Sequence, residues 1–161
     1  MIELQGIAEA KGAKVAVIVS RFNEFITKKL LEGALATLDE TGVADEDITI
    51  IWVPGSFELP VALAEAFELG FDMAVCLGVV IRGETAHFDF VAGEAARGIA
   101  ALATEKRFPV GFGVITAEDT DQALARAGGK KGNKGREAAL AAVEIADLLR
   151  RLRGQNREMI V

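Results

Sequence analysis

The chain contains a single cysteine and a single histidine in 161 residues, which limits the chemistry that its side chains can perform. Cys76 lies in the apolar run MAVCLGVV, where a free cysteine is most often a small buried core residue. His87 is the only imidazole available to move protons near neutral pH. Any acid–base catalysis that depends on histidine must therefore use this one residue.

The sequence has no long apolar segment of the kind that spans a membrane, and no basic, cleavable segment opens it. The formal net charge of −6 argues against a broad nucleic-acid-binding surface, which needs an excess of positive charge. A local basic cluster of Lys130, Lys131, Lys134 and Arg136 suits a small anion instead. We expect a cytoplasmic protein that binds neither membranes nor nucleic acids.

Strand-like apolar runs alternate with helix-like segments along the chain, and 51% of the residues are hydrophobic. The predicted strand and helix pairs are 14–19 with 24–40, 48–53 with 57–69, 73–81 with 86–106, and 110–116 with 119–127, followed by a last helix at 133–153. This order predicts an α/β fold, a three-layer α/β/α sandwich around a four-stranded parallel sheet. We expect one domain over residues 1–161, with 154–161 as a flexible tail.

The segment GETAHFDF (83–90) joins the third predicted strand to the next helix. His87 falls in the first turn of that helix, and Thr85 is its predicted N-cap. The first N–H groups of a helix lack intrahelical acceptors, and Arg82 directly precedes the segment, so this junction can hold an anion. One short segment thus combines an anion site with an acid–base group.

In a parallel α/β sheet, ligands bind beyond the carboxyl ends of the strands, so the residues that follow each strand are candidates. After the first strand, Phe22 either stacks on a flat ring or packs over the first helix. After the second, Ser56 and Glu58 either meet a ligand or simply cap the next helix. The run RAGGKKGNKG (126–135) either recruits an anion or is a solvated basic loop. The sequence leaves these alternatives open.

Taken in order, SRFN, VPGSFELP, GETAHFDF, FGVIT and RAGGKKGNKG closely resemble the lumazine synthase family, over roughly residues 6–153. The resemblance implies a flavodoxin-like fold and a transferase of riboflavin biosynthesis that uses no metal and no other cofactor. The implied reaction joins 5-amino-6-(D-ribitylamino)uracil to 3,4-dihydroxy-2-butanone 4-phosphate. Its products are 6,7-dimethyl-8-ribityllumazine, phosphate and water.

The resemblance also implies roles for individual residues, with His87 as the catalytic group that transfers protons. The residues implied in binding the pyrimidine and the ribityl chain are Phe22, Asn23, Ser56, Phe57, Glu58, Val80, Ile81, Phe112 and Lys134. The residues implied in binding phosphate are Gly83, Glu84, Thr85 and Arg126. Gly129 departs from the family pattern, which usually has threonine there, so its share in phosphate binding is in doubt.

Members of the family form homopentamers, and in some of them twelve pentamers build an icosahedral shell of sixty subunits. By resemblance, Phe112, Arg126 and Lys134 would enter the active site of a neighbouring subunit, and riboflavin synthase would be a further partner. Two other interpretations remain. One is a shell or scaffold protein without activity. The other is a flavin-binding module, although SRFN lacks the Ser/Thr/Gly-rich phosphate loop expected there.

Overall fold

A four-stranded parallel sheet forms the centre of the molecule, in a computed structural model that describes residues 1–159 and the side chains of residues 1–154. Its strands are β1 (Val15–Ser20), β2 (Ile48–Val53), β3 (Met73–Ile81) and β4 (Val110–Ala117), in the order β2-β1-β3-β4. The two central strands, β1 and β3, are buried almost throughout, as expected of strands covered on both faces. The strand order reverses between them, which is where such sheets bind ligands.

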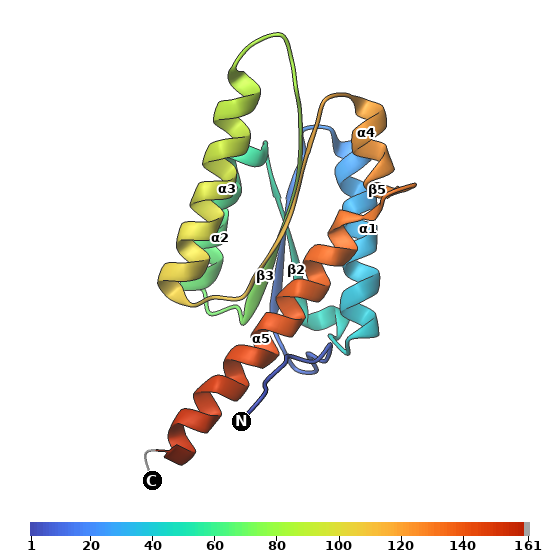
Figure 1. Cartoon of the computed structure of the whole chain (residues 1–161). Helices are drawn as coiled ribbons and strands as arrows, with labels where there is room; N and C mark the ends of the chain where they lie inside the picture. Colours follow the sequence, from blue (N-terminus) through green and yellow to red (C-terminus); the bar gives the residue numbers. More distant parts are fainter. Residues whose placement is uncertain (160–161) are drawn as a thin grey trace.

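Helices cover both faces of the sheet (Figure 1). On one face lie α1 (Glu24–Glu40), α4 (Thr120–Ala125) and α5 (Lys134–Met159). On the other lie α2 (Leu59–Glu68) and α3 (His87–Lys106). Two short 3-10 helices, η1 (Asp45–Asp47) and η2 (Ser56–Glu58), flank β2. This arrangement confirms the predicted three-layer α/β/α sandwich.

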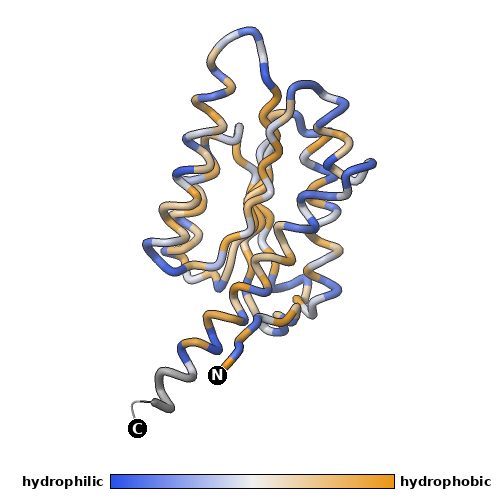
Figure 2. The backbone as a smooth tube through the Cα atoms, in the orientation of Figure 1, coloured by the Kyte–Doolittle hydropathy of each residue, from blue (hydrophilic) through white to orange (hydrophobic). Residues whose placement is uncertain are grey.

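The core divides into two clusters because successive side chains of a strand point to opposite faces of the sheet. In β1, Val15, Val17 and Val19 pack under α1 and α5, whereas Ala16 and Ile18 belong to the cluster under α2 and α3. Hydrophobic residues accordingly run along the strands and along the helix faces turned toward them (Figure 2). Each layer of the sandwich is thus held to the sheet by its own apolar contacts.

Cys76 of β3 is fully buried in the cluster under α2 and α3, which confirms its prediction as a core residue. Burial raises the pKa of its thiol to about 12. Because the thiolate is the nucleophilic form of cysteine, this residue is inert in the folded protein. Within residues 1–159, none of the helices has the length and apolar character that crossing a membrane requires.

The glycine-rich run after α4 differs from the expected loop. It forms a small antiparallel hairpin of β5 (Ala127–Gly129) and β6 (Gly132–Asn133), and α4 ends at Ala125, before the predicted end at residue 127. The hairpin forms because Gly128 and Gly132 adopt positive φ angles, 103° and 81°, which glycine reaches without steric cost.

The last helix is longer than predicted. It continues to Met159, whereas apolar spacing in the sequence indicated an end at residue 153. Gly154 carries no side chain and the residues after it are mostly polar, so the pattern lacked the apolar signal that marks a packed helix. Residues 154–159, which were expected to be a flexible tail, therefore belong to α5. Residues 160–161 lie outside the described residues.

Candidate active site

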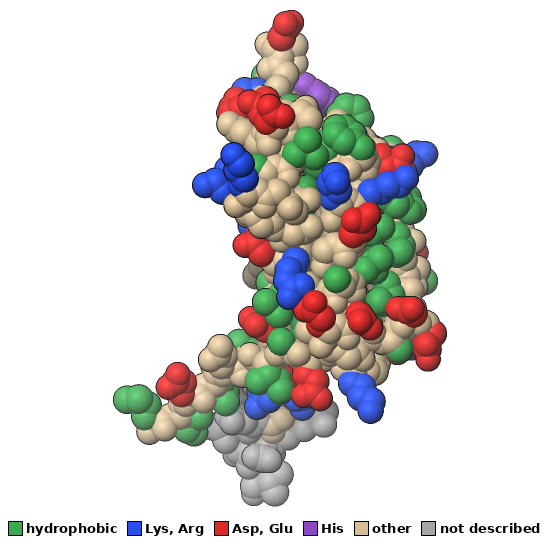
Figure 3. Space-filling model, turned by 90° about the vertical axis from the view of Figure 1, so that its right-hand side faces the viewer, with side chains coloured by type: hydrophobic (Ala, Val, Ile, Leu, Met, Phe, Trp, Pro, Cys, Tyr) green, Lys and Arg blue, Asp and Glu red, His purple; other side chains and the backbone are tan. Residues whose placement is uncertain are grey.

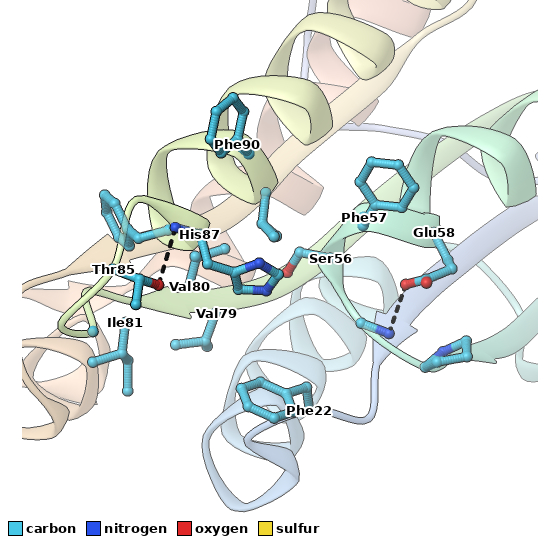
Figure 4. A pocket seen from close by; sticks show the side chains of 15 residues that line it. Phe22, Ser56, Phe57, Glu58, Val79, Val80, Ile81, Thr85, His87 and Phe90 are labelled. Carbon is cyan, nitrogen blue, oxygen red and sulfur yellow. Dashed lines mark hydrogen bonds between the residues drawn. The ribbon is translucent and has the colours of Figure 1, made fainter.

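A pocket of about 680 Å³ lies beyond the carboxyl ends of β1, β2 and β3, next to the reversal of strand order (Figure 4). This volume suits a small organic ligand. The lining comes from the loops after β1, β2 and β3, from the end of β3 and from the start of α3: Phe22, Pro54, Gly55, Ser56, Phe57, Glu58, Val79, Val80, Ile81, Gly83, Thr85, His87, Phe88, Phe90 and Val91. Most of the candidate residues from the sequence are therefore brought together.

Phe22 stands in the β1–α1 loop with 68% of its surface exposed. That exposure excludes the alternative in which Phe22 is packed over the first helix. The loop is held by two backbone bonds to the β2 loop, from Arg21 N–H to the Val53 carbonyl (2.8 Å) and from Phe22 N–H to the Pro54 carbonyl (3.1 Å). The backbone of Phe22 is thus held in place, while its aromatic ring stays uncovered.

Asn23 does not line the pocket, because it starts α1 instead. Its backbone is left-handed (φ 58°), a conformation that asparagine tolerates better than most residues, and its carbonyl accepts the amides of Ile26 and Thr27. The structure therefore gives Asn23 a backbone role in shaping the loop that carries Phe22.

The turn after β2 has a structural role in addition to its place in the pocket. Glu58 accepts a hydrogen bond from the Gly55 amide through Oε2 (3.0 Å), which closes the turn of η2. The Ser56 hydroxyl is buried against β3 and has no hydrogen bond within the described side chains. A Cβ at Gly78 would lie 2.5 Å from that oxygen, so glycine at this position lets the turn pack closely on the strand.

His87 is the first residue of α3, and its imidazole projects into the pocket (Figure 4). The single histidine, purple in Figure 3, lies at the surface at the end of the molecule remote from the C-terminus of α5. The helix cap is Ala86, so the prediction of Thr85 as the N-cap was wrong by one residue. The Thr85 hydroxyl nevertheless accepts the His87 amide (3.4 Å), which satisfies one N–H at the helix start.

Arg82 does not face the pocket, contrary to its expected place beside the anion site. Its guanidinium pairs with Glu118 and stacks on Phe88. Glu84 is also absent from the pocket lining, although Gly83 and Thr85 on either side of it are present. The loop thus offers its backbone and its threonine to the pocket, and keeps both charged side chains outside it.

Three other predicted residues lie away from this pocket in the same chain. Phe112 is 42% exposed on β4, an edge strand of the sheet. Arg126 follows α4 and donates through Nη1 to the Gln122 carbonyl (2.9 Å). Lys134 begins α5, and its amide donates to the Arg126 carbonyl (2.8 Å). The hairpin therefore joins Arg126 to Lys134, but neither residue lines this pocket.

Phe90 lines the pocket although the sequence motifs did not indicate it. Phe88 and Val91 belong to the apolar stripe of α3 that packs against the core, and both also line the pocket where this stripe ends. Phe90 is 70% exposed and lies off that stripe. A large aromatic residue on the polar side of an amphipathic helix was the available signal. Among the described residues, no group of three or more His, Cys, Asp or Glu side chains is arranged to hold a metal ion.

Comparisons with known proteins agree with the order of these motifs. Residues 12–150 match the family model described as 6,7-dimethyl-8-ribityllumazine synthase. The chain is also 50% identical, over 155 residues, to a protein of Edwardsiella ictaluri (strain 93-146) named 6,7-dimethyl-8-ribityllumazine synthase. That match covers 95% of this chain and 99% of the relative.

Proposed function

The chain belongs to the 6,7-dimethyl-8-ribityllumazine synthase family, and on that basis we propose that the pocket beyond β1, β2 and β3 is its active site. The enzyme condenses 5-amino-6-(D-ribitylamino)uracil with 3,4-dihydroxy-2-butanone 4-phosphate. It forms 6,7-dimethyl-8-ribityllumazine and releases phosphate and water, in riboflavin biosynthesis. The observation that carries the proposal for the site is that loops after three strands bring Phe22, the Ser56–Glu58 turn and His87 to one pocket.

Phe22 stacks on the pyrimidine ring in this proposal. The exposed face of its ring supports the role, since aromatic rings gain free energy by covering a flat heterocycle. The end of β3, at Val80 and Ile81, lies at the base of the pocket and meets the polar edge of the pyrimidine through backbone groups. Asn23 contributes by holding the loop of Phe22 in shape.

The ribityl chain lies along the turn formed by Ser56, Phe57 and Glu58. Glu58 uses Oε2 to accept the Gly55 amide, which leaves Oε1 as an acceptor for a ribityl hydroxyl. Because the same carboxylate closes the turn, sugar recognition and loop shape are coupled. A change at Glu58 should therefore affect both binding of the uracil substrate and order of the turn.

The phosphate of the second substrate binds at the start of α3. Gly83 and Thr85 line the pocket there, the Glu84 amide lies between them, and the helix start favours an anion. His87 lies next to this site. It accepts a proton from the amine as the C–N bond to the ketone carbon forms, and it later donates a proton as phosphate departs. Holding both substrates together supplies much of the rate enhancement, because the uncatalysed reaction is bimolecular.

Arg126, Lys134 and Phe112 act on the pocket of a neighbouring subunit. The support is their position, since none of the three lines the pocket of its own chain, and the Phe112 ring is partly uncovered on an edge strand. The Arg126 guanidinium would pair with the phosphate, and Phe112 would cover the pyrimidine from the far side. We propose a homopentamer in the cytoplasm, able to assemble further into a shell, with each site shared by two subunits.

The direct test is to mix the purified protein with both substrates and to follow the absorbance of the lumazine product, next to a His87→Ala variant. We expect product formation well above the uncatalysed rate. The variant should be slower by about 10²-fold but not inactive, because acid–base catalysis supplies that order of acceleration. Only the background rate with the wild-type protein would contradict the proposed function and favour an inactive scaffold.

A further inference from the structure

Arg82 lies outside the pocket, yet three groups hold its side chain, and one of them, Phe88, lines the pocket. Its Nε lies 3.0 Å from Glu118 Oε2 and donates a hydrogen bond of 3.2 Å to Glu118 Oε1. Its Nη1 lies 3.6 Å from Asp89 Oδ1, and its guanidinium carbon lies 4.4 Å from the centre of the Phe88 ring. A planar guanidinium can stack and pair at the same time, which an ammonium group cannot do.

These contacts close the loop that carries the proposed phosphate site. Arg82 is the first residue after β3, whereas Phe88 and Asp89 lie in the first turn of α3, so the contacts bracket residues 83–87. Those five residues are all exposed. Within the described part of the chain, their own hydrogen bonds are local, such as the bond from the His87 amide to the Thr85 hydroxyl. The Arg82 side chain is therefore the main tertiary restraint on the loop.

The same side chain ties this loop to the next connection of the sheet. The Arg82 amide donates to the Ala117 carbonyl at the end of β4 (2.8 Å), and Glu118 follows directly. Glu118 is itself fixed, because its amide donates to Gln122 Oε1 of α4 (2.9 Å). The β3–α3 and β4–α4 connections lie at the same end of the molecule (Figure 1). Arg82 thus joins two loops that the chain would otherwise leave independent.

We propose that Arg82 is a positioning residue: it holds residues 83–87 in the shape in which the loop amides and the His87 imidazole meet the phosphate of the substrate. The inference rests on the proposed function, because it assumes that phosphate binds at this loop. Its effect is on geometry more than on folding, since exposed ion pairs contribute little to stability. A catalytic group displaced by about 1 Å loses much of its rate advantage.

The test compares Arg82→Gln with Arg97→Gln as a matched control. Arg97 is an exposed arginine on α3, and it pairs with Glu94 of the same helix. The Arg97–Glu94 ion pair therefore restrains no loop. Arg82→Gln should raise the KM for the butanone phosphate about tenfold and lower kcat, with little change in Tm. Arg97→Gln should behave as the wild type in all three measurements.

A second readout does not depend on turnover. His87 is the only imidazole in the chain, so in the untagged protein its NMR signals report this loop alone. Titration with inorganic phosphate should shift these signals in the wild-type protein, and Arg82→Gln should need about tenfold more phosphate for the same shift. Glu118→Gln removes the ion pair with Glu118 but keeps the pair with Asp89 and the stacking on Phe88, so it should change the titration in the same direction by a smaller factor.

Arg82→Lys separates positioning from direct attraction of phosphate. Lysine keeps the charge but loses stacking and two-point pairing, so it should resemble Arg82→Gln. Full rescue by lysine, or a wild-type titration with glutamine, would overturn the positioning role. Failure of the proposed function gives a different result, because the wild-type protein would then form no lumazine. The His87 NMR signals followed during addition of inorganic phosphate would still decide whether Arg82 shapes the loop.

Discussion

The Ile7 amide donates a hydrogen bond of 3.0 Å to Oδ2 of Asp147, a residue 140 positions further along the chain. The Asp147 side chain is almost completely buried, and it also pairs with Arg150 (2.7 Å) and Arg151 (2.6 Å). Gly6 lets the N-terminal segment approach α5 closely enough for this contact, because a Cβ at residue 6 would collide with the Glu144 carbonyl of α5. Asp147 therefore fixes the N-terminal segment to the last helix.

Asp147→Asn should release the N-terminal segment and destabilise the fold by about 2 kcal/mol, since it weakens charge-assisted hydrogen bonds to a buried group. Amide hydrogen exchange at Ile7 provides the site-specific measurement, and we expect loss of its protection. The pocket residues should keep their protection, because they lie at the other end of the sheet. Unchanged exchange at Ile7 would contradict the role of this contact.

The same carboxylate should make stability depend on pH. Burial by itself would raise the pKa of Asp147, but the Ile7 amide and the two arginines outweigh it and lower the pKa to about 2. The folded-state value lies below the value of about 4 expected in the unfolded chain. The contribution is therefore complete above about pH 4 and is lost as the pH falls through about 2. The difference in Tm between wild type and Asp147→Asn should shrink over that interval.

Arg126→Ala should raise the KM for the butanone phosphate about tenfold or more, because it removes a charge-assisted contact, and should change kcat less. If the site is shared between subunits, the inactive or weakened variants His87→Ala and Arg126→Ala should complement each other. Mixed assemblies, made by refolding the two variants together, would contain some sites with both wild-type residues. Activity of the mixture no higher than the average of the separate variants would contradict a shared site.

Gly135→Ala should destabilise the fold by about 2 kcal/mol or more, because the added methyl group would meet the backbone carbonyl of Leu30 in α1, and backbone yields less easily than a side chain. Gly154→Ala is the matched control in the same helix. A Cβ there meets nothing within 4 Å, so alanine should leave stability equal or slightly higher. Chemical denaturation of the two variants measures both changes.

The Cys76 thiol should resist thiol reagents in the folded protein, because it is fully buried and its pKa is raised to about 12. Labelling should occur at the rate at which the core opens, and it should become rapid in denaturant. Cys76→Ala, which has no thiol, is the control for reagent consumed elsewhere. Rapid labelling of the native protein would mean that the sheet opens far more readily than its burial indicates.

The sequence alone predicted the strands and most helices, in several places to the residue. β2, β3 and α1 coincide with the predicted ranges, because a run of apolar residues or a regular three-four spacing is a local signal. The predicted end of the last helix was wrong, since its final turns lack apolar residues to mark them. The hairpin after α4 was predicted as a loop. Its turn depends on the positive φ angles of Gly128 and Gly132, and a glycine-rich sequence allows such angles without requiring them.

Most of the candidate site could also be predicted, because the residues that follow parallel strands gather at one edge of the sheet. Phe22, Ser56 and His87 meet there for that reason. The sequence could not tell that Arg82 turns away from the pocket toward Glu118, or that Asp147 holds Ile7, because a side chain's partners depend on which distant segments the fold brings near it. Local sequence determined the order of strands and helices and the loops that carry the chemistry, whereas tertiary packing decided which of the charged side chains shape the site and which hold the chain together.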